Sequence, residues 1–201
     1  MILCDIGNTH FHFNKNGLIY DEKECTIKNE KIYFISVNDK KTKELLKKNP
    51  NSINLENYIK FNTSYKGIGI DRIMACVTIE DGVIIDAGSA ITIDIMASGI
   101  HLGGYILPGI MALKESYTNI SDKLNTFSLN INTKILPSNT TEAISYGSIG
   151  MIISFIEKIS KNKPLYFTGG DGAYLAKFFD AVYLKDLVFQ GMKKTIKENN
   201  L

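Results

Sequence analysis

The sequence has little of what marks a disulfide scaffold, a zinc site or a secreted protein. Its three cysteines are odd in number, lie far apart and form no C-x-x-C pair, which favours reduced thiols over disulfides or a metal site. The first residues, MILCDIGNTH, carry no basic segment before an apolar stretch, so no signal peptide is predicted. No apolar run approaches the roughly 20 residues of a membrane helix. We therefore expect a cytoplasmic location and no membrane partner.

Charge of one sign is not in excess either. The chain has 23 basic and 21 acidic residues, a formal net charge of +2, so its overall field predicts no nucleic-acid partner. The lysines at 40, 41, 43, 47 and 48 are interpreted as the solvated face of one short helix. With 201 residues and 44% hydrophobic content, the chain can bury the core of one large domain or two small ones.

Hydrophobic periodicity and turn residues predict an α/β fold with alternating elements. The chain opens with a hairpin turned by Asn16-Gly17, the strongest short hairpin signal. Asn139 or Thr140 is expected to cap a long helix, with Glu142 near the capping-box position. The strands are predicted over 1–6, 10–13, 18–20, 31–37, 52–55, 83–85, 90–96, 101–107, 165–167 and 181–184. The helices are predicted over 40–48, for two to three turns from 71, and over 109–124, 140–161, 173–179 and 186–198.

An internal repeat is the most informative pattern in the chain. Residues 5–9 and 86–90 read DIGNT and DAGSA, so both follow D-x-G-[NS]-[TA] after an apolar strand. Each is followed by an alternating segment and a second turn glycine, Gly17 or Gly99. Two copies of one supersecondary unit in a short chain predict two related domains.

The residue types of the repeat suit phosphate binding. Glycine lets the backbone approach an anion closely, and Asn, Ser and Thr add hydrogen-bond donors. An aspartate needs a cation between itself and a phosphate, so Asp5 is a candidate for hydrated Mg²⁺ and Asp86 for a second cation. The alternative is that each motif is only a β-turn, because Asp, Gly and Asn are common turn formers. The matched pair favours phosphate binding.

Other nucleotide motifs are absent. No G-x-x-x-x-G-K-[ST] occurs, and residues 67–69 lack the third glycine of a dinucleotide fingerprint. Paired phosphate hairpins are instead typical of the actin-like and sugar-kinase superfamily. Within it, the chain resembles the type III pantothenate kinases. The resemblance rests on six segments in the family's order, at residues 5–9, 69–72 (G-x-D-R), 86–92, 103–109 (G-G-x-I-x-P-G), 139–147 and 168–170.

The resemblance implies ATP-dependent phosphorylation of pantothenate to 4'-phosphopantothenate, the first step of coenzyme A synthesis. It also implies two related actin-like (ribonuclease H-like) domains, at residues 1–82 and 83–201, with an ATP cleft between them. The implied partners are pantothenate, ATP and a second copy of the chain, in a homodimer with the substrate site at its interface. Thr140 would be donated across that interface, although it is equally a helix cap.

The resemblance also assigns roles to single residues. Asp71 is implied to be the catalytic base, although it could instead cap a helix, with Arg72 in a surface ion pair. The implied cations are Mg²⁺, held through water by Asp5, and a monovalent ion, K⁺ or NH₄⁺, held by Asp86. Substrate contacts are implied for Gly69, Ile70, Arg72 and Thr140, and ATP contacts for Asp5, Ile6, Gly7, Asn8, Thr9, His10, Phe11, His12 and Ser89. As a metal pair, His10 and His12 lack a third ligand, so packing or exposure is the favoured interpretation.

The chain departs from the family's usual pattern at three positions. Asn62 and Tyr65 stand where a Tyr and a Pro usually precede the motif Asp, and Ser89 replaces a Thr. The changes at Asn62 and Tyr65 keep open a kinase for another small hydroxylated metabolite. A second alternative, a non-catalytic transcriptional accessory factor on the same scaffold, stays open because such a factor shares this family resemblance.

Overall fold

The computed structural model describes residues 1–132 and 135–201, and the chain divides into two compact units. Unit 1 comprises Met1–Glu80, Met96–Gly103 and Asp186–Leu201, and unit 2 comprises Asp81–Ile95 and Gly104–Lys185. The predicted boundary after residue 82 thus falls near the first change of unit, but two later segments are counted with unit 1. In the described residues, no helix is long and apolar enough to cross a bilayer.

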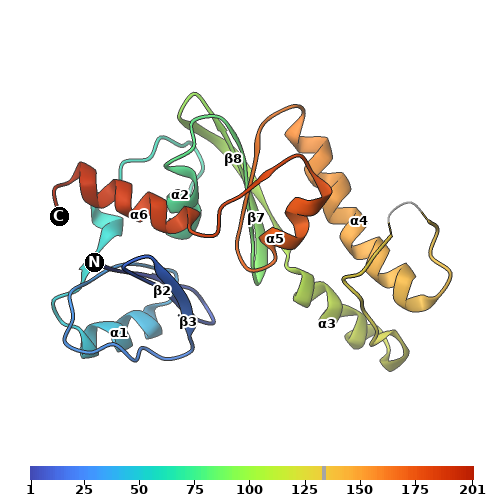
Figure 1. The fold of residues 1–201 in the computed structure, drawn as a ribbon, viewed down its shortest axis with the longest axis horizontal. Helices are drawn as coiled ribbons and strands as arrows, with labels where there is room; N and C mark the ends of the chain where they lie inside the picture. The colour runs from blue at the N-terminus through green and yellow to red at the C-terminus, as the bar shows by residue number, and fades with distance from the viewer. Residues whose placement is uncertain (133–134) are drawn as a thin grey trace. The chain divides into compact units, whose positions relative to one another are not determined.

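Helices and strands alternate as expected (Figure 1). The first sheet has the order β3-β2-β1-β4-β5 and the second the order β10-β9-β6-β7-β8. The strands are β1 (Ile2–Ile6), β2 (Phe11–Lys15), β3 (Leu18–Glu22), β4 (Ile32–Ser36), β5 (Ile53–Asn54), β6 (Gly82–Ala87), β7 (Ala90–Ala97), β8 (Ile100–Pro108), β9 (Leu165–Thr168) and β10 (Val182–Tyr183). The helices are α1 (Asp39–Lys48), α2 (Ile70–Cys76), α3 (Ile110–Ile120), α4 (Thr140–Ser160), α5 (Gly172–Leu175) and α6 (Leu187–Glu198), with 3₁₀ turns η1 (Leu55–Tyr58), η2 (Asp122–Leu124) and η3 (Ala176–Phe178).

The two sheets repeat one topology. Reading the second sheet backwards gives β8-β7-β6-β9-β10, which matches β3-β2-β1-β4-β5 strand for strand. In the first sheet β1 is antiparallel to β2 and parallel to β4, and in the second β6 is parallel to β9, the counterpart of β4. The predicted α/β class with two related domains of the actin-like type is therefore confirmed.

The hairpin β2–β3 of unit 1 forms for the predicted reason. Asn16 and Gly17 both have positive φ, 53° and 95°, as a two-residue type I′ turn requires. The side chain of Asn14 accepts a hydrogen bond from the Gly17 N–H at 2.9 Å. Four of the five residues of β1 are buried, because this strand lies in the middle of its sheet.

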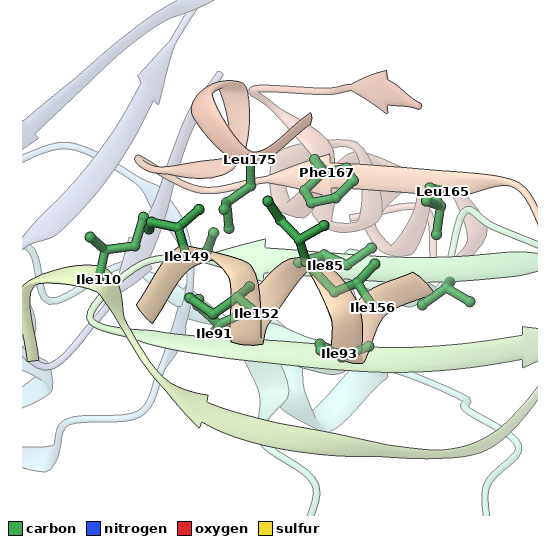
Figure 2. Packing of buried hydrophobic residues seen from close by; sticks show 13 residues of the cluster. Ile85, Ile91, Ile93, Ile110, Ile149, Ile152, Ile156, Leu165, Phe167 and Leu175 are labelled. Carbon is green, nitrogen blue, oxygen red and sulfur yellow. The ribbon is translucent and has the colours of Figure 1, made fainter. Parts of the chain in front are cut away.

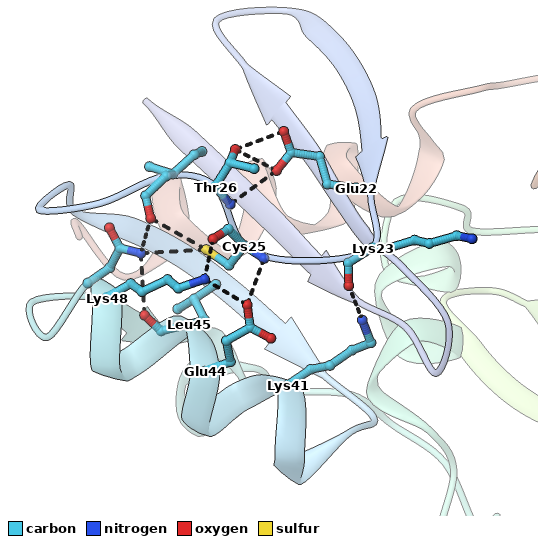
Figure 3. A network of polar contacts seen from close by, with 10 residues as sticks. Glu22, Lys23, Cys25, Thr26, Lys41, Glu44, Leu45 and Lys48 are labelled. Atoms are coloured by element: carbon cyan, nitrogen blue, oxygen red, sulfur yellow. Dashed lines mark hydrogen bonds and ion pairs between the residues drawn. The ribbon is translucent and has the colours of Figure 1, made fainter.

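Helix α1 is tied to the segment after β3 by a polar network (Figure 3). Lys48 Nζ donates to the Cys25 carbonyl at 2.7 Å and to Glu44 Oε1 at 2.9 Å, and Glu44 Oε1 also accepts the Cys25 N–H. Lys41 Nζ donates to the Lys23 carbonyl at 2.7 Å. Two of the lysines that were expected to be simply solvated therefore hold a loop in place.

The core of unit 2 forms where α4 packs on the sheet (Figure 2). Ile149, Ile152 and Ile156 of this helix recur at a spacing of three to four residues, which places them on one face. They are fully buried together with strand residues such as Ile85 and Phe167. The helix predicted over 109–124 is shorter than expected: α3 ends at Ile120 because Ser121 is extended, and its side chain caps η2 instead.

A close approach of two helices within unit 1 gives a stability prediction. A Cβ at Gly191 of α6 would overlap the carbonyl of Met74 in α2, a backbone atom that cannot turn away. We expect Gly191→Ala to lower the free energy of unfolding by about 1–3 kcal/mol, measured by urea denaturation. Gly150→Ala in α4 is the matched control, because its Cβ would meet only the Tyr146 ring at 3.7 Å. Equal effects of the two variants would contradict this packing.

Candidate active site

The first phosphate hairpin lies at the turn between β1 and β2 in unit 1. The Gly7 N–H donates to the His10 carbonyl at 3.0 Å and closes the turn, which leaves Asn8 and Thr9 exposed. Asn38, which caps α1, supports the turn from outside by donating to the Asn8 carbonyl at 3.3 Å. The turn thus presents two polar side chains and backbone groups, as the D-x-G-N-T pattern predicts.

Not every residue expected to contact ATP offers its side chain. Ile6 and Phe11 are fully buried in the core of unit 1, so only their backbone atoms are available to a ligand. His12 is paired with Asp5 across β1 and β2, and its Nδ1 lies 2.7 Å from Asp21 Oδ1 on β3. The rings of His10 and His12 are 6.2 Å apart. In the described part of the chain no group of three His, Cys, Asp or Glu residues forms a metal site.

The second phosphate hairpin lies between β6 and β7 in unit 2. Its turn is tighter, since the Gly88 N–H donates to the Ala90 carbonyl at 3.0 Å. Ser89 is exposed at the tip, and its carbonyl accepts the N–H of Gly109 at 3.2 Å. A Cβ at Gly109 would overlap the carbonyls of Gly88 and Ser89, so the end of β8 can lie against this turn only as glycine.

A third glycine segment approaches the carboxylate of the same hairpin. Gly169 follows β9 with a φ of +83°, and a Cβ there would overlap both Asp86 Oδ1 and the Ala87 carbonyl. The N–H of Asp171 donates to that carbonyl at 2.9 Å. Tyr183 Oη donates to the Gly169 carbonyl at 3.3 Å, and burial, followed by the charge of Asp86, raises the pKa of this tyrosine. Three segments far apart in sequence therefore meet around Asp86.

The G-x-D-R segment forms the start of α2 in unit 1. Gly69 is the N-cap residue, and no side chain caps this end. The Asp71 carboxylate turns back over the helix start, where its Oδ1 accepts the Arg72 N–H at 2.9 Å. A Cβ at Gly69 would overlap that oxygen, so glycine leaves room for the carboxylate. Asp71 is not the N-cap residue, so that alternative was wrong in detail.

Arg72 is buried rather than placed in a surface ion pair. Its relative exposure is 5%, and its guanidinium carbon lies 4.9 Å from the centre of the Tyr65 ring. It is also the only arginine among the 23 basic residues of the chain. That count was a signal available in the sequence, because a planar guanidinium is needed only where a fixed fork of donors matters.

Thr140 begins α4 in unit 2 and is exposed. Asn139 is the cap: its side chain accepts the Glu142 N–H at 3.0 Å, and Glu142 Oε2 accepts the Ser138 N–H at 2.8 Å. Glu142 thus reaches back to the residue before the cap, a variant of the capping box, and Asn139 rather than Thr140 has the capping role. The first hairpin and the G-x-D-R segment thus belong to unit 1, whereas Asp86, Ser89 and Thr140 belong to unit 2.

These segments can be compared with known proteins. The family model described as type III pantothenate kinase matches residues 23–162. The chain belongs to the type III pantothenate kinase family. Relatives with this name include one from Campylobacter jejuni serotype O:2, 52% identical over 99% of this chain and 98% of its own, and one from Helicobacter hepaticus, 47% identical over 98% and 99%. A third, from Wolinella succinogenes, is 45% identical over 98% and 97%.

Solved structures share the fold of this chain. A conserved Campylobacter jejuni protein, described as a presumed Baf family transcriptional activator, superposes with a TM-score of 0.91 at 49% identity, over the whole of both chains. Component A of (R)-2-hydroxyglutaryl-CoA dehydratase from Acidaminococcus fermentans has a TM-score of 0.50 at 10% identity, over 96% of this chain and 98% of its own, which shows a shared fold alone.

The hydrogen bonds of Glu142 at the start of α4 predict that the stability of the fold depends on pH. Hydrogen bonds from the backbone and side chain of Ser138 lower the pKa of Glu142 below its usual value. The carboxylate therefore stabilises the fold above its unfolded pKa of about 4.3, and this stability is lost as the pH falls through the lower folded pKa. Glu142→Gln should have a lower urea midpoint than the wild type at pH 7.

The difference in urea midpoint between the wild type and Glu142→Gln should disappear at low pH. Once the pH falls below the lowered pKa of Glu142 in the folded protein, the wild-type carboxyl is protonated and loses its advantage over the amide. Glu157→Gln, an exposed change on the same helix, shows the effect of removing one carboxylate without a capping box. A gap between wild type and Glu142→Gln that is as large at pH 3 as at pH 7 would contradict the assignment.

Proposed function

We propose that this chain transfers the γ-phosphoryl group of ATP to the primary hydroxyl of pantothenate, which yields 4'-phosphopantothenate at the start of coenzyme A synthesis. The observation that carries the proposal is the start of α2, where Asp71 is followed by the buried, sole arginine of the chain. The names of the relatives supply the identity of the acceptor. Both residues match the G-x-D-R segment residue for residue.

Asp71 is proposed to act as the base. Phosphoryl transfer has a loose transition state, so the aspartate needs only to orient the hydroxyl and to accept its proton late. The hydroxyl oxygen forms a bond to the γ-phosphorus, the bond from that phosphorus to the bridging oxygen breaks, and ADP leaves. The fixed carboxylate of Asp71, held by the Arg72 N–H, suits this orienting role.

Arg72 is proposed to bind the carboxylate of pantothenate. Its guanidinium presents donors in a planar fork, which matches a carboxylate with two parallel hydrogen bonds. Gly69 and Ile70 precede Asp71 at the start of α2 and are proposed to contact the acceptor, with the buried Ile70 available only through its backbone. Selection of the acceptor and its activation would therefore come from adjacent residues.

The hairpins are proposed to bind the phosphates of ATP through the backbone and polar side chains of residues 5–12 and through Ser89. Asp5 would hold Mg²⁺ through water, because Mg²⁺ usually keeps its waters and takes one or two carboxylates together with substrate phosphates. When bound, the metal would neutralise charge on the phosphates. Asp5 is half-buried near the end of β1, next to the turn, where a carboxylate can face a hydrated ion.

Asp86 is proposed to bind the monovalent cation, K⁺ or NH₄⁺. What supports this is the donor type at the site: Gly169 lies so close to Asp86 Oδ1 and the Ala87 carbonyl that no Cβ would fit, which brings a carboxylate and a backbone carbonyl oxygen to the same glycine. Oxygen donors of this kind suit hard cations. The ion would offset negative charge from the phosphates.

A homodimer with Thr140 contacting the partner's substrate is also proposed. Unit 2 leaves large apolar side chains exposed on α3 and α4, among them Met111, Ile120 and Met151. Burying such a surface against a second copy would stabilise an assembly. We further propose a cytoplasmic location, because the three cysteines are free thiols.

Changing Asp71 tests the proposed chemistry. Asp71→Asn should lower kcat with pantothenate by about a hundred- to ten-thousand-fold, because the amide cannot accept the proton. The KM for ATP should change little. Asp39→Asn, in the first turn of α1, is the matched control and should keep full activity. Formation of phosphopantothenate, followed by mass spectrometry with ATP, Mg²⁺ and K⁺, is the measurement.

The same assay separates the alternatives. If the wild type phosphorylates another small alcohol but not pantothenate, that alcohol is the acceptor and the proposed substrate is wrong. The assay should include a panel of sugars for this reason. A wild type without kinase activity, whose biological role survives Asp71→Asn, would favour the regulatory function suggested by the Baf relative's name.

Changing Asp86 tests the cation assignment. Asp86→Asn should raise the K⁺ concentration for half-maximal activity by at least about tenfold, because removal of a ligand charge weakens cation binding. Asp81→Asn, an exposed change just before the same strand, should leave this K⁺ concentration unchanged. Titrating KCl at constant ionic strength measures the difference, and an unaltered K⁺ response of Asp86→Asn would refute the assignment.

A further inference from the structure

An aromatic stack in unit 1 leads from Arg72 to the tip of the hairpin β7–β8. The guanidinium carbon of Arg72 lies 4.9 Å from the centre of the Tyr65 ring. That ring in turn meets the imidazole of His101 edge-on, with centroids 6.0 Å apart. Phe61 lies on the same imidazole, with a centroid distance of 5.5 Å. His101 is 1% exposed, so the stack has a rigid, buried base.

Hydrogen bonds fix the loop that carries Tyr65. Thr63 Oγ1 lies 2.7 Å from His101 Nδ1 and also accepts the N–H of Tyr65 at 3.0 Å. The backbone N–H of His101 donates to the Asn62 carbonyl at 3.0 Å, and Thr63 and His101 form a parallel β-bridge. The backbone just before Tyr65, at Asn62 and Thr63, is therefore tied to the hairpin tip, which restricts where the Tyr65 ring can lie.

The arrangement explains two departures from the usual family pattern. Asn62 stands where a Tyr is usual and serves here through its backbone carbonyl, while Tyr65, where a Pro is usual, supplies an aromatic ring. A proline at 65 would lack the N–H that Thr63 accepts. The ring is thus three residues further along the chain, and it lies on the guanidinium.

We infer that Tyr65, held by His101 and Thr63, is a positioning residue that orients the Arg72 guanidinium for the carboxylate of the acceptor. An aromatic face attracts a guanidinium and fixes its plane, which decides where the fork of donors points. Tyr65 itself is 36% exposed at the edge of the loop and acts through the arginine. The inference rests on the proposed function of Arg72.

Kinetics on loop variants tests this role. Tyr65→Leu keeps apolar bulk but removes the aromatic face, so the KM for pantothenate should rise by about three- to thirtyfold, with the KM for ATP and kcat nearly constant. Tyr65→Phe should retain wild-type values, because the ring suffices. Thr63→Val should give a smaller rise, since it removes the Thr63 hydroxyl that contacts His101 Nδ1 and accepts the Tyr65 N–H. Tyr58→Ala, equally exposed in unit 1 but outside the stack, is the control.

The single arginine offers a second readout that needs no turnover. A sample labelled with ¹⁵N-arginine gives one Nε–Hε signal, which the Tyr65 ring should shift through its ring current. Tyr65→Leu should move this signal, Tyr65→Phe should leave it in place, and pantothenate should move it in the wild type. A protein that failed to fold would show at once in the spectrum.

The outcomes separate the inference from the proposed function. The inference alone is overturned if the wild type is active and Tyr65→Leu leaves the KM for pantothenate unchanged. It is also overturned if Tyr65→Leu does not shift the arginine signal. A wild type that neither turns over pantothenate nor shifts its arginine signal on adding it overturns both. A rise in the ATP KM as large as that for pantothenate would show general damage to the loop and would also overturn the inference.

Discussion

A carboxylate at the end of a buried strand is the constraint on which the rest of the structure depends. Asp5 and Asp86 are each the penultimate residue of the central strand of a sheet, and they follow three and four buried residues of that strand, respectively. Burying a charge is costly unless polar groups or ions compensate it. Both strands therefore end in a glycine turn, where backbone groups and water can reach the carboxylate. The glycine turn therefore serves the charge of the aspartate as well as the reversal of the chain.

The two copies solve this constraint with different supports. The first turn spans Gly7 to His10 and is held from outside by the side chain of Asn38. The second is one residue tighter, and backbone groups of Gly109 and of the segment that begins at Gly169 lie against it. A side-chain support tolerates movement, whereas glycines in contact with carbonyls leave little. The second turn is therefore the more rigidly supported of the two.

Much of this could be predicted from the sequence, because the informative signals are local. The hairpin turn at Asn16-Gly17, the strand ends at Asp5 and Asp86 and the capping box at Asn139 depend on neighbouring residues, and all appear where expected. Long-range packing had no such signal. Residues 186–201 belong to unit 1 because Gly191 lets α6 approach α2, and a glycine in a helix does not reveal its partner. The stack on Arg72 was missed for the same reason.

Arg72 stands out because the chain has no other arginine. All other members of the Lys and Arg set in this chain are lysines. Among them, Lys41 and Lys48 each hold a loop through a hydrogen bond to a backbone carbonyl. A lysine ammonium is a compact, strongly hydrated charge, so burying it at 5% exposure beside an aromatic ring would cost more than burying a guanidinium. The guanidinium is more weakly hydrated and stacks on the ring that supports it. An arginine therefore suits this buried position beside an aromatic ring better than a lysine would.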